Sequence, residues 1–415
     1  MRFNPFRPGS IVSPGMFCGR GAEVIAIEQS LFQTKNGNPA HFLIEGERGI
    51  GKSSLMLYVN LLATNQLVGS EYFNFISLQI ELNDVDDDTD IVRKIGMALK
   101  RELIRSFDIK AIAKGIYDWV INWNVLGVEY KKDKDGIDSL GAMEDLADLM
   151  ARVIKDAGSN TLGALDGILV LIDEADAACD TANLGRFLKL FTERLSKREC
   201  DRVCFGLAGL PSLVPKLKDG HESSPRIFQD LNLQPLRPEE RREVVRRGLV
   251  EANAKNETET KIDESALTLI SALSEGYPHF IQQFSHSAFA SDEDYNITEE
   301  DVMDGAFSEN GAMDQLAKRY YNKMYFEQIW SEDYRRVLHA MTEYLDQWVS
   351  RAQIIKSSGI KETQVNNALA ALKTRGIILA NEQKKGEYRL PTKAFAVWLK
   401  IKSDKPMSVK SAAQP

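Results

Sequence analysis

The feature that most constrains this chain is the segment EGERGIGKSS at positions 45–54, which lies between a short apolar run and a stretch with helical spacing. It fits the pattern GxxxxGK(S/T), with Gly46, Gly51, Lys52 and Ser53 at the fixed positions. Glycines let successive backbone N–H groups converge on phosphate oxygens, and the following helix adds the positive end of its dipole. The segment therefore predicts a phosphate-binding loop between a strand and a helix.

A second motif, ILVLIDEAD at positions 168–176, supplies carboxylates at the end of an apolar strand. We expect Lys52 to reach the β- and γ-phosphates, while the Ser53 hydroxyl and Asp173 hold Mg²⁺, the latter through water. Glu174 is placed to orient or deprotonate the attacking water, which favours hydrolysis over phosphate transfer to a metabolite. The loop residues expected to contact the nucleotide are Gly46, Glu47, Arg48, Gly49, Ile50, Gly51, Lys52, Ser53 and Ser54.

Strand and helix patterns alternate through the first half of the chain. HFLIE, FNFISLQIEL, ILVLID and RVCFGLAGL read as strands, and SSLMLYVNLLA and LGRFLKLFTERLSK have helical spacing. This alternation predicts an α/β fold with a parallel sheet covered by helices on both faces. We assign residues 1–236 to this domain, with an insertion at about 105–145 whose role the sequence does not reveal. The segment NPFRPGSIVSP, rich in proline and glycine, should run extended over the surface.

The second half of the chain has a different pattern of apolar positions. Residues 237–310 carry helix-period apolar positions without strand signals, which predicts a small α-helical lid. Residues 325–402 read as three helices followed by a hairpin that turns near Lys384, the pattern of a winged helix-turn-helix. Residues 403–415 are small and polar, and we expect them to be disordered.

Composition places the chain among globular proteins with more than one domain. At 415 residues it is too long for one ordinary domain, and neither a signal peptide nor a run of about 18 apolar residues occurs, so we expect a cytosolic protein without a membrane partner. The four cysteines lack zinc-ligand spacing, which favours buried free thiols. The net charge of −8 is uneven, because residues 331–402 hold thirteen Lys or Arg against seven Asp or Glu. That asymmetry favours a separate basic module.

Four segments together carry a family resemblance: FCGRGAE, GERGIGKSS, LVLIDEAD and EGYPHFIQQF. They resemble the AAA+ and STAND P-loop ATPases, in particular the branch of origin-recognition-type (ORC/CDC-like) initiators and related bacterial ATPases, over residues 4 to 400. The resemblance implies ATP and Mg²⁺ as cofactors, a helical lid after the nucleotide-binding domain, and a C-terminal winged helix. It also implies that an FxGRxxE element lies beside the adenine and ribose, which here assigns that place to Phe17, Gly19, Arg20 and Glu23.

Other family roles come with alternatives. Asn83 stands where the family has a polar residue that restrains the catalytic glutamate, although it equally suits an ordinary turn. Arg226 resembles the arginine that contacts the γ-phosphate of a neighbouring subunit; it could also be a surface arginine, and Arg198 and Arg202 are rivals. A trans arginine would stabilise transition-state charge and make hydrolysis depend on assembly into a homo-oligomer.

Two departures from the family pattern concern phosphate sensing. Where the lid of many members has an arginine that touches the γ-phosphate, the turn GYPH places His279. A histidine lacks a permanent charge, so we expect weaker or differently controlled coupling between nucleotide and lid. After RVCFGLAGL only Ser212 is available as a polar sensor. Both departures favour a slow, switch-like ATPase.

The winged helix offers side chains suited to double-stranded DNA within residues 350–390. Arg, Lys, Asn and Gln on a recognition helix read base edges, and lysines on the wing contact phosphates. The candidates are Lys361, Gln364, Asn367, Lys373, Arg375, Lys384 and Lys385. Winged helices also bind proteins, so an effector protein is the alternative partner.

These observations predict an ATPase whose ATP- or ADP-bound state controls self-assembly and association with DNA, with Lys52, Glu174 and Arg226 as catalytic residues. One alternative is a STAND-type signalling switch that holds ADP when closed and recruits an effector, for example in bacterial defence. Another is the ATPase subunit of a transposition or restriction system. The same residues would serve all three.

Overall fold

The computed structural model describes residues 2–12, 14–106, 139–157, 165–177, 182–329, 331–345, 347–381 and 384–404. The chain forms two compact units, one from Ile11 to Gln234 and one that combines Met1–Ser10 with Pro235–Pro415. Most of the expected insertion, Cys179 and the expected disordered tail from residue 405 lie outside the described residues. The units differ from the expected division in two respects: the first ten residues pack with the C-terminal part, and the segments expected as a lid and a winged helix belong to one unit.

The first unit is built on a five-stranded parallel sheet. Its strands are β1 (His41–Glu45), β2 (Phe75–Glu81), β3 (Gly167–Asp173), β4 (Val203–Gly209) and β5 (Phe228–Asn232), in the spatial order β2-β3-β4-β1-β5. All neighbouring pairs are parallel. The predicted parallel sheet is confirmed, and β5 extends it beyond the strands that the sequence indicated. All five carboxyl ends therefore lie along one edge, where parallel sheets place their ligands.

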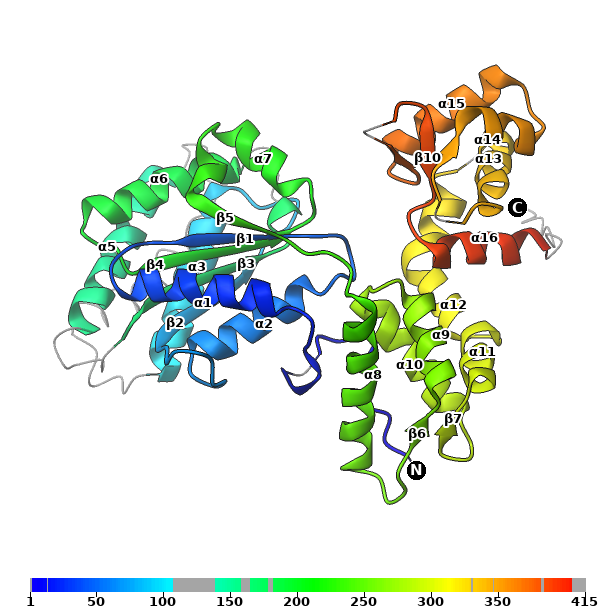
Figure 1. Ribbon diagram of the computed structural model, residues 1–415. Helices are drawn as coiled ribbons and strands as arrows, with labels where there is room; N and C mark the ends of the chain where they lie inside the picture. The colour runs from blue at the N-terminus through cyan, green and yellow to red at the C-terminus, as the bar shows by residue number, and fades with distance from the viewer. Residues whose placement is uncertain are drawn as a thin grey trace, which may run out of the picture. The chain divides into compact units, whose positions relative to one another are not determined.

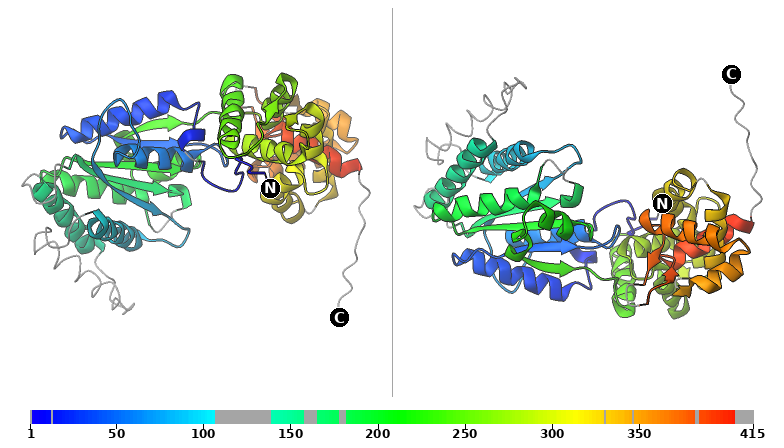
Figure 2. Two further views of the ribbon diagram at one scale, coloured as in Figure 1. Left: turned by 90° about the horizontal axis from the view of Figure 1, so that it is seen from below. Right: turned by 90° about the horizontal axis from the view of Figure 1, so that it is seen from above.

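Helices cover both faces of this sheet (Figures 1 and 2). On one face lie α1 (Gly21–Lys35) and α2 (Lys52–Ala63), and on the other lie α3 (Asp88–Ser106), α5 (Ser139–Ala157) and α6 (Leu184–Lys197). The second face holds an apolar cluster in which Ile95, Met150 and Phe191 of these helices pack with strand residues such as Val170 and Phe205. A short helix, α7 (Leu213–Gly220), follows β4.

The second unit begins with a helical bundle. It contains α8 (Pro238–Asn253), α9 (Glu264–Ser274), α10 (Pro278–Ser291), α11 (Glu299–Phe307) and α12 (Ala312–Leu316). Two very short strands, β6 (Lys261–Ile262) and β7 (Asn296–Ile297), pair beside them. Thr298 caps α11 by accepting a hydrogen bond from the Asp301 N–H, as the sequence suggested. The helical fold predicted for this part of the chain is therefore confirmed.

A three-helix module with a small sheet completes this unit. Its helices are α13 (Glu332–Thr342), α14 (Arg351–Ser358) and α15 (Glu362–Thr374). The strands β8 (Val349–Ser350), β9 (Leu379–Ala380) and β10 (Glu387–Arg389) form an antiparallel sheet in the order β8-β10-β9. Three helices with such a hairpin make the predicted winged helix-turn-helix. A further helix, α16, spans Lys393–Asp404. Its Trp398 stacks on Phe395 of the same helix and packs against Tyr321 of the π-helical segment Ala317–Tyr321.

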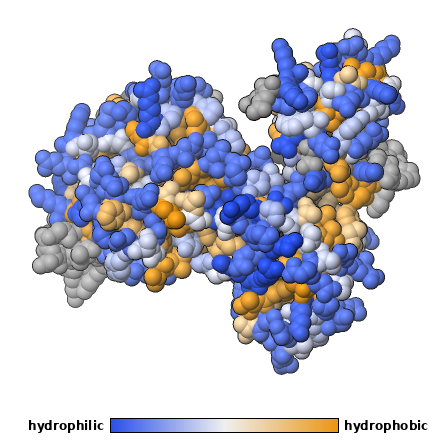
Figure 3. All heavy atoms as spheres, viewed as in Figure 1, coloured by the Kyte–Doolittle hydropathy of each residue, from blue (hydrophilic) through white to orange (hydrophobic). Residues whose placement is uncertain are grey.

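The surface is that of a globular protein. The face drawn in Figure 3 is mostly hydrophilic, with hydrophobic residues in small groups among polar ones. Among the helices of the described residues, none combines the length and apolar composition that crossing a bilayer requires.

Candidate functional site

The phosphate-binding loop occupies the turn between β1, which ends at Glu45, and α2, which begins at Lys52. Gly51 caps α2 with φ 101°, and Gly49 has φ 80°, conformations that residues with a Cβ rarely adopt. A Cβ on Gly46 would lie 2.7 Å from the Ile50 side chain. The loop therefore keeps the backbone open as a cradle at a helix N-terminus, which fits a phosphate group.

Lys52 fills this cradle with its own ammonium group. The Nζ atom donates hydrogen bonds to the carbonyl oxygens of Gly46 (2.8 Å) and Glu47 (3.2 Å). Burial lowers the pKa of Lys52, and the charges of Glu174 and Asp173 oppose that shift. The ammonium is thus held at the loop by backbone oxygens, a position from which it can exchange them for phosphate oxygens.

Ser53 and Asp173 lie together although they come from different motifs. The Ser53 hydroxyl donates a 2.8 Å hydrogen bond to Asp173 Oδ2. Strands β1 and β3 both flank β4, so their carboxyl ends bring α2 and the end of β3 to the same edge. A hydroxyl and a carboxylate are the hard oxygen donors that Mg²⁺ takes beside nucleotide phosphates. The pair therefore fits a magnesium ion.

Glu174 follows with an unusual backbone conformation. Its φ is 51°, in the left-handed region, and its N–H donates to Asp173 Oδ1 (2.9 Å). Burial raises the pKa of Glu174, and the nearby charges of Asp173 and Asp176 raise it further. A strained acidic residue with a raised pKa at the end of a central strand is typical of a functional position.

Asp176 is a residue whose part in the site the sequence reasoning missed. It is buried, and its Oδ1 accepts a 2.8 Å hydrogen bond from the Leu210 N–H just after β4. It joins the turn after β3 to the turn after β4. The sequence does contain a signal for this residue: Asp176 is the second aspartate of DEAD, close after Asp173.

The Arg20 side chain contacts the phosphate-binding loop. Its guanidinium is buried and donates to the carbonyl oxygens of Ile50 (3.0 Å) and Gln234 (2.7 Å), with Glu23 3.5 Å away. Phe17, which the resemblance places near adenine, stacks on Tyr58 of α2 with ring centroids 4.8 Å apart. The FxGRxxE element thus lies against the phosphate-binding loop and α2.

Asn83 and Ser212 lie near this edge of the sheet but show no special geometry. The Leu82 N–H, directly before Asn83, donates to the carbonyl oxygen of Asp173 at 3.2 Å. Asn83 is exposed, and its own N–H donates to Asp86 Oδ2 (2.6 Å), the arrangement of a turn. Ser212 is exposed at the start of α7.

The three arginine candidates differ in what holds them. Arg198 forms ion pairs with Glu144 and Asp148, both at 2.5 Å. Arg202 donates to the carbonyl oxygens of Leu165 (2.9 Å) and Ile154 (3.0 Å). These two side chains therefore make contacts within the first unit.

Arg226 is exposed on the turn Ser224–Ile227 before β5. Its N–H donates to the Ser223 carbonyl oxygen (3.1 Å), but its guanidinium has no hydrogen bond or ion pair within the part of the chain that the structure describes. It is the one candidate of the three whose guanidinium is available to a partner.

His279 belongs to the second unit, in the first turn of α10. Burial lowers its pKa to about 4, and the charge of Arg319 contributes. Its ring lies edge-on to Tyr320 with centroids 5.3 Å apart. At neutral pH the His279 imidazole is therefore uncharged.

The candidate DNA-contacting side chains divide into two sets. The half-buried Gln364 donates to Asp333 Oδ2 (2.8 Å), and the exposed Arg375 donates to the Gln328 carbonyl oxygen (2.5 Å), so both side chains have partners within the unit. The remaining candidates are also exposed, on α15, its N-cap and the wing: Lys361, Asn367, Lys373, Lys384 and Lys385.

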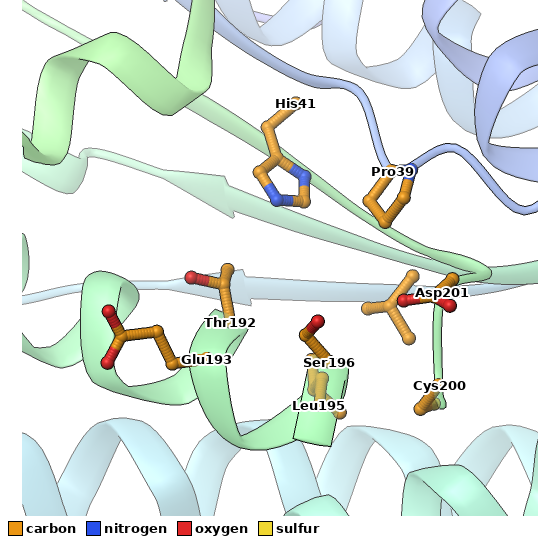
Figure 4. Close-up of a pocket in the computed structure, with 9 residues that line it drawn as sticks. Pro39, His41, Thr192, Glu193, Leu195, Ser196, Cys200 and Asp201 are labelled. Atoms are coloured by element: carbon orange, nitrogen blue, oxygen red, sulfur yellow. The ribbon is translucent and has the colours of Figure 1, made fainter. Parts of the chain in front are cut away.

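A pocket of about 280 Å³ lies at the amino end of the sheet, away from the phosphate-binding loop. Figure 4 shows the His41 ring of β1 pointing toward Thr192 and Ser196 on α6, with Asp201 beside them. His41 Nδ1 accepts a hydrogen bond from the Phe205 N–H (3.2 Å), and burial lowers its pKa to about 4. This pocket is separate from the site above.

Comparisons with known proteins concern the fold. No protein-family model matches the chain, and no curated protein matches its sequence. A Walker-type ATPase of Pyrococcus abyssi is 14% identical over 92% of this chain and 95% of its own, with a TM-score of 0.54. The ORC2 protein of Aeropyrum pernix in its ADPNP–ADP complexes is 14% identical over 97% of this chain and 99% of its own, with a TM-score of 0.51. The chain therefore has the fold of AAA+ P-loop ATPases of the origin-recognition type, as its motifs predicted.

Proposed function

We propose that this protein binds and hydrolyses ATP, and that its nucleotide state controls self-assembly and association with DNA through the winged helix. The observation that carries the proposal is the Ser53–Asp173 hydrogen bond beside Lys52 and Glu174. The similar ORC2 structure was determined with ADPNP and ADP, which agrees with a nucleotide at the loop. The residues supply the four functions that phosphoryl transfer to water needs: cradle, cation, metal oxygens and base.

In this mechanism, the loop N–H groups and the Lys52 ammonium bind the β- and γ-phosphates. Mg²⁺, when bound, neutralises charge on these phosphates, and Ser53 and Asp173 would hold it. Glu174 accepts a proton from the attacking water, for which it must be ionised. Its raised pKa makes it a stronger base than an ordinary glutamate once it is ionised.

The position of Arg226 favours action on another subunit. It precedes β5, whose first residue pairs with His41 at the amino end of β1, whereas the phosphate-binding loop follows the carboxyl end of β1. A strand of five residues separates these ends by roughly 16 Å. Arg226 therefore lies at the far edge from its own loop, and a γ-phosphate within its reach would belong to a second copy of the chain.

DNA association is proposed for the exposed lysines of the winged helix. Lys361 and Lys373 lie at the two ends of α15, and Lys384 and Lys385 lie on the wing, an arrangement suited to phosphates on either side of a groove. The internal bonds of Gln364 and Arg375 leave Asn367 as the exposed amide for base contact. The same internal bonds favour the alternative of a protein partner, because they reduce the set available for base reading.

The test combines nucleotide binding with particle size. Purified protein should bind a fluorescent ATP analogue in a Lys52-dependent manner and hydrolyse ATP, and its sedimentation should change between ADP and ATP. Duplex DNA should bind more tightly in one nucleotide state than in the other. Equal binding by wild type and Lys52→Ala, with both folded, would refute the proposed site.

A further inference from the structure

We propose that the helical part of the second unit carries a peptide-binding site whose ligand is residues 2–8 of the same chain. We call this segment, RFNPFRP, the N-terminal latch. Its docking surface is formed by α8, α10 and the segments beside β6 and β7, with contacts from Gly248, Asn256, Thr260, Gln282, Phe289 and Asp292. The segment was expected only to run extended over the surface.

The first anchor is Arg2. Its guanidinium donates to Asp292 Oδ2 (2.5 Å), to the Asp292 carbonyl oxygen (2.9 Å) and to Thr260 Oγ1 (2.7 Å). It lies 3.8 Å from the centroid of the Phe289 ring. The Asp292 side chain is 0% exposed, so the arginine neutralises a fully buried carboxylate. Removing one partner of such a buried pair leaves an uncompensated charge, which strongly destabilises a protein.

The second set of contacts recognises the backbone of the latch. Asn256 accepts from the Phe3 N–H (2.7 Å) and donates to the Phe3 carbonyl oxygen (2.9 Å), so one side-chain amide satisfies both polar groups of one residue. Further along, the Arg7 N–H donates to Gln282 Oε1 (2.9 Å), and Gln282 is 2% exposed. Such main-chain contacts give affinity for an extended peptide, while side-chain anchors give specificity.

The third anchor is Phe6, which is 2% exposed and meets Phe289 edge-on with ring centroids 6.3 Å apart. It packs on Gly248 in the middle of α8, where an added Cβ would lie 2.3 Å from the ring. Glycine inside a helix weakens that helix relative to alanine. The absence of a side chain at this position is what lets the Phe6 ring approach α8.

Docking has a consequence for how the two units are connected. The chain passes between them at Ser10–Ile11 and again at Gln234–Pro235. With the latch docked, both passages tie the units; with the latch released, only the second does. Arg20 bonds the carbonyl oxygens of Ile50 in the phosphate-binding loop and of Gln234 at the second passage. The docked latch therefore adds a connection at Ser10–Ile11. This connection lies close in sequence to Arg20, the residue that joins the phosphate-binding loop to the chain at the other connection.

The first experiment adds a side chain on α8 at the position where the Phe6 ring packs. Gly248→Ala in the full chain should expose residues 2–8 to hydrogen exchange, and it should lower the midpoint of thermal unfolding of the helical unit. In a chain that lacks residues 1–9, the same substitution should raise that midpoint slightly, because alanine favours the helix. The same sign of change in both chains would overturn the proposal.

The second experiment supplies the latch as a separate peptide. A peptide of residues 1–10 should bind the chain that lacks residues 1–9 and raise its unfolding midpoint. The Arg2→Ala peptide should bind at least about tenfold more weakly, because it leaves Asp292 unpaired. The Arg7→Ala peptide is the matched control, since the Arg7 side chain is 45% exposed and, among the described residues, has only a 3.5 Å ion pair with Glu251.

Two results would contradict docking within one chain. Equal binding of the wild-type and Arg2→Ala peptides, or no binding of either to a folded truncated chain, would show that the contacts do not form a specific site. A full-length chain that is dimeric without nucleotide and becomes monomeric on addition of the peptide would show that the segment docks on a second copy. A monomeric full chain that does not bind the peptide supports docking in cis.

Discussion

The Ser53 hydroxyl and Asp173 Oδ2 are 2.8 Å apart, although 120 positions separate them in the chain. One belongs to the first turn of α2 and the other to the last residue of β3, and only the parallel sheet brings them to the same edge. Their hydrogen bond links the residue that would ligate Mg²⁺ to the residue that would orient its water shell. The two motifs therefore form one site.

Ser53→Ala should weaken binding of Mg²⁺-ATP while leaving magnesium-free ATP nearly unaffected. The hydroxyl provides a metal oxygen and donates a charge-assisted hydrogen bond, which is worth about 1.5–3 kcal/mol, or roughly 10- to 150-fold in affinity. Titration of a fluorescent ATP analogue with magnesium and with a chelator measures both values. An equal loss under the two conditions would show that the serine acts on the loop and not on the metal.

Glu174 should give the turnover rate an acidic limb above pH 4.5, the ordinary value for this carboxyl group. Burial raises the pKa of Glu174, so the base is lost by protonation at a higher pH than usual. Asp176→Asn removes a nearby negative charge and retains a side-chain oxygen for the Leu210 N–H. In that variant the limb should move to lower pH, as a pH profile of kcat would show. A limb that does not move would assign the titration to another group.

Arg226→Ala should lower ATP hydrolysis without lowering stability, because its side chain is exposed on the turn before β5. Mixed with Glu174→Gln, it should recover part of the activity, since a mixed pair has one site with both the base and the partner's arginine. Arg198→Ala is the contrasting variant: its ion pairs with Glu144 and Asp148 make loss of stability the expected effect. Assays of each variant alone and of the mixture decide the point, and an inactive mixture of folded variants would contradict a shared site.

The sequence predicted the elements whose chemistry is local. The phosphate-binding loop, the strand that ends at Asp173 and the three helices of the winged helix each carry their pattern within about fifteen residues. What it missed depends on distant contacts. The bond from Arg20 to Gln234 spans 214 positions, and that from Arg2 to Asp292 spans 290. An arginine has no periodicity that reveals such a partner, so the docking of the first ten residues on the helical unit could not be foreseen.

Removal of the wing lysines should reduce the salt dependence of DNA binding. Each lysine that neutralises a phosphate adds about 0.9 to the slope of log K against log salt, so Lys384→Ala with Lys385→Ala should flatten it by roughly 2. Lys197→Ala with Lys218→Ala removes the same charge from exposed positions of the first unit and should leave the slope unchanged. Fluorescence anisotropy at several salt concentrations measures it. An unchanged slope in the wing variant would favour the protein-binding alternative.

His41 should make the first unit less stable in acid. Its pKa is lowered from 6.5 to about 4 by burial, so the unfolded chain binds the proton more readily and the free energy of unfolding falls as pH drops from 6.5 toward 4. Between pH 7 and pH 5 the expected loss is about 2 kcal/mol. His41→Asn retains an acceptor for the Phe205 N–H but does not titrate. Urea unfolding of both proteins at the two pH values measures the difference, and an equal fall in both would show that other groups cause it.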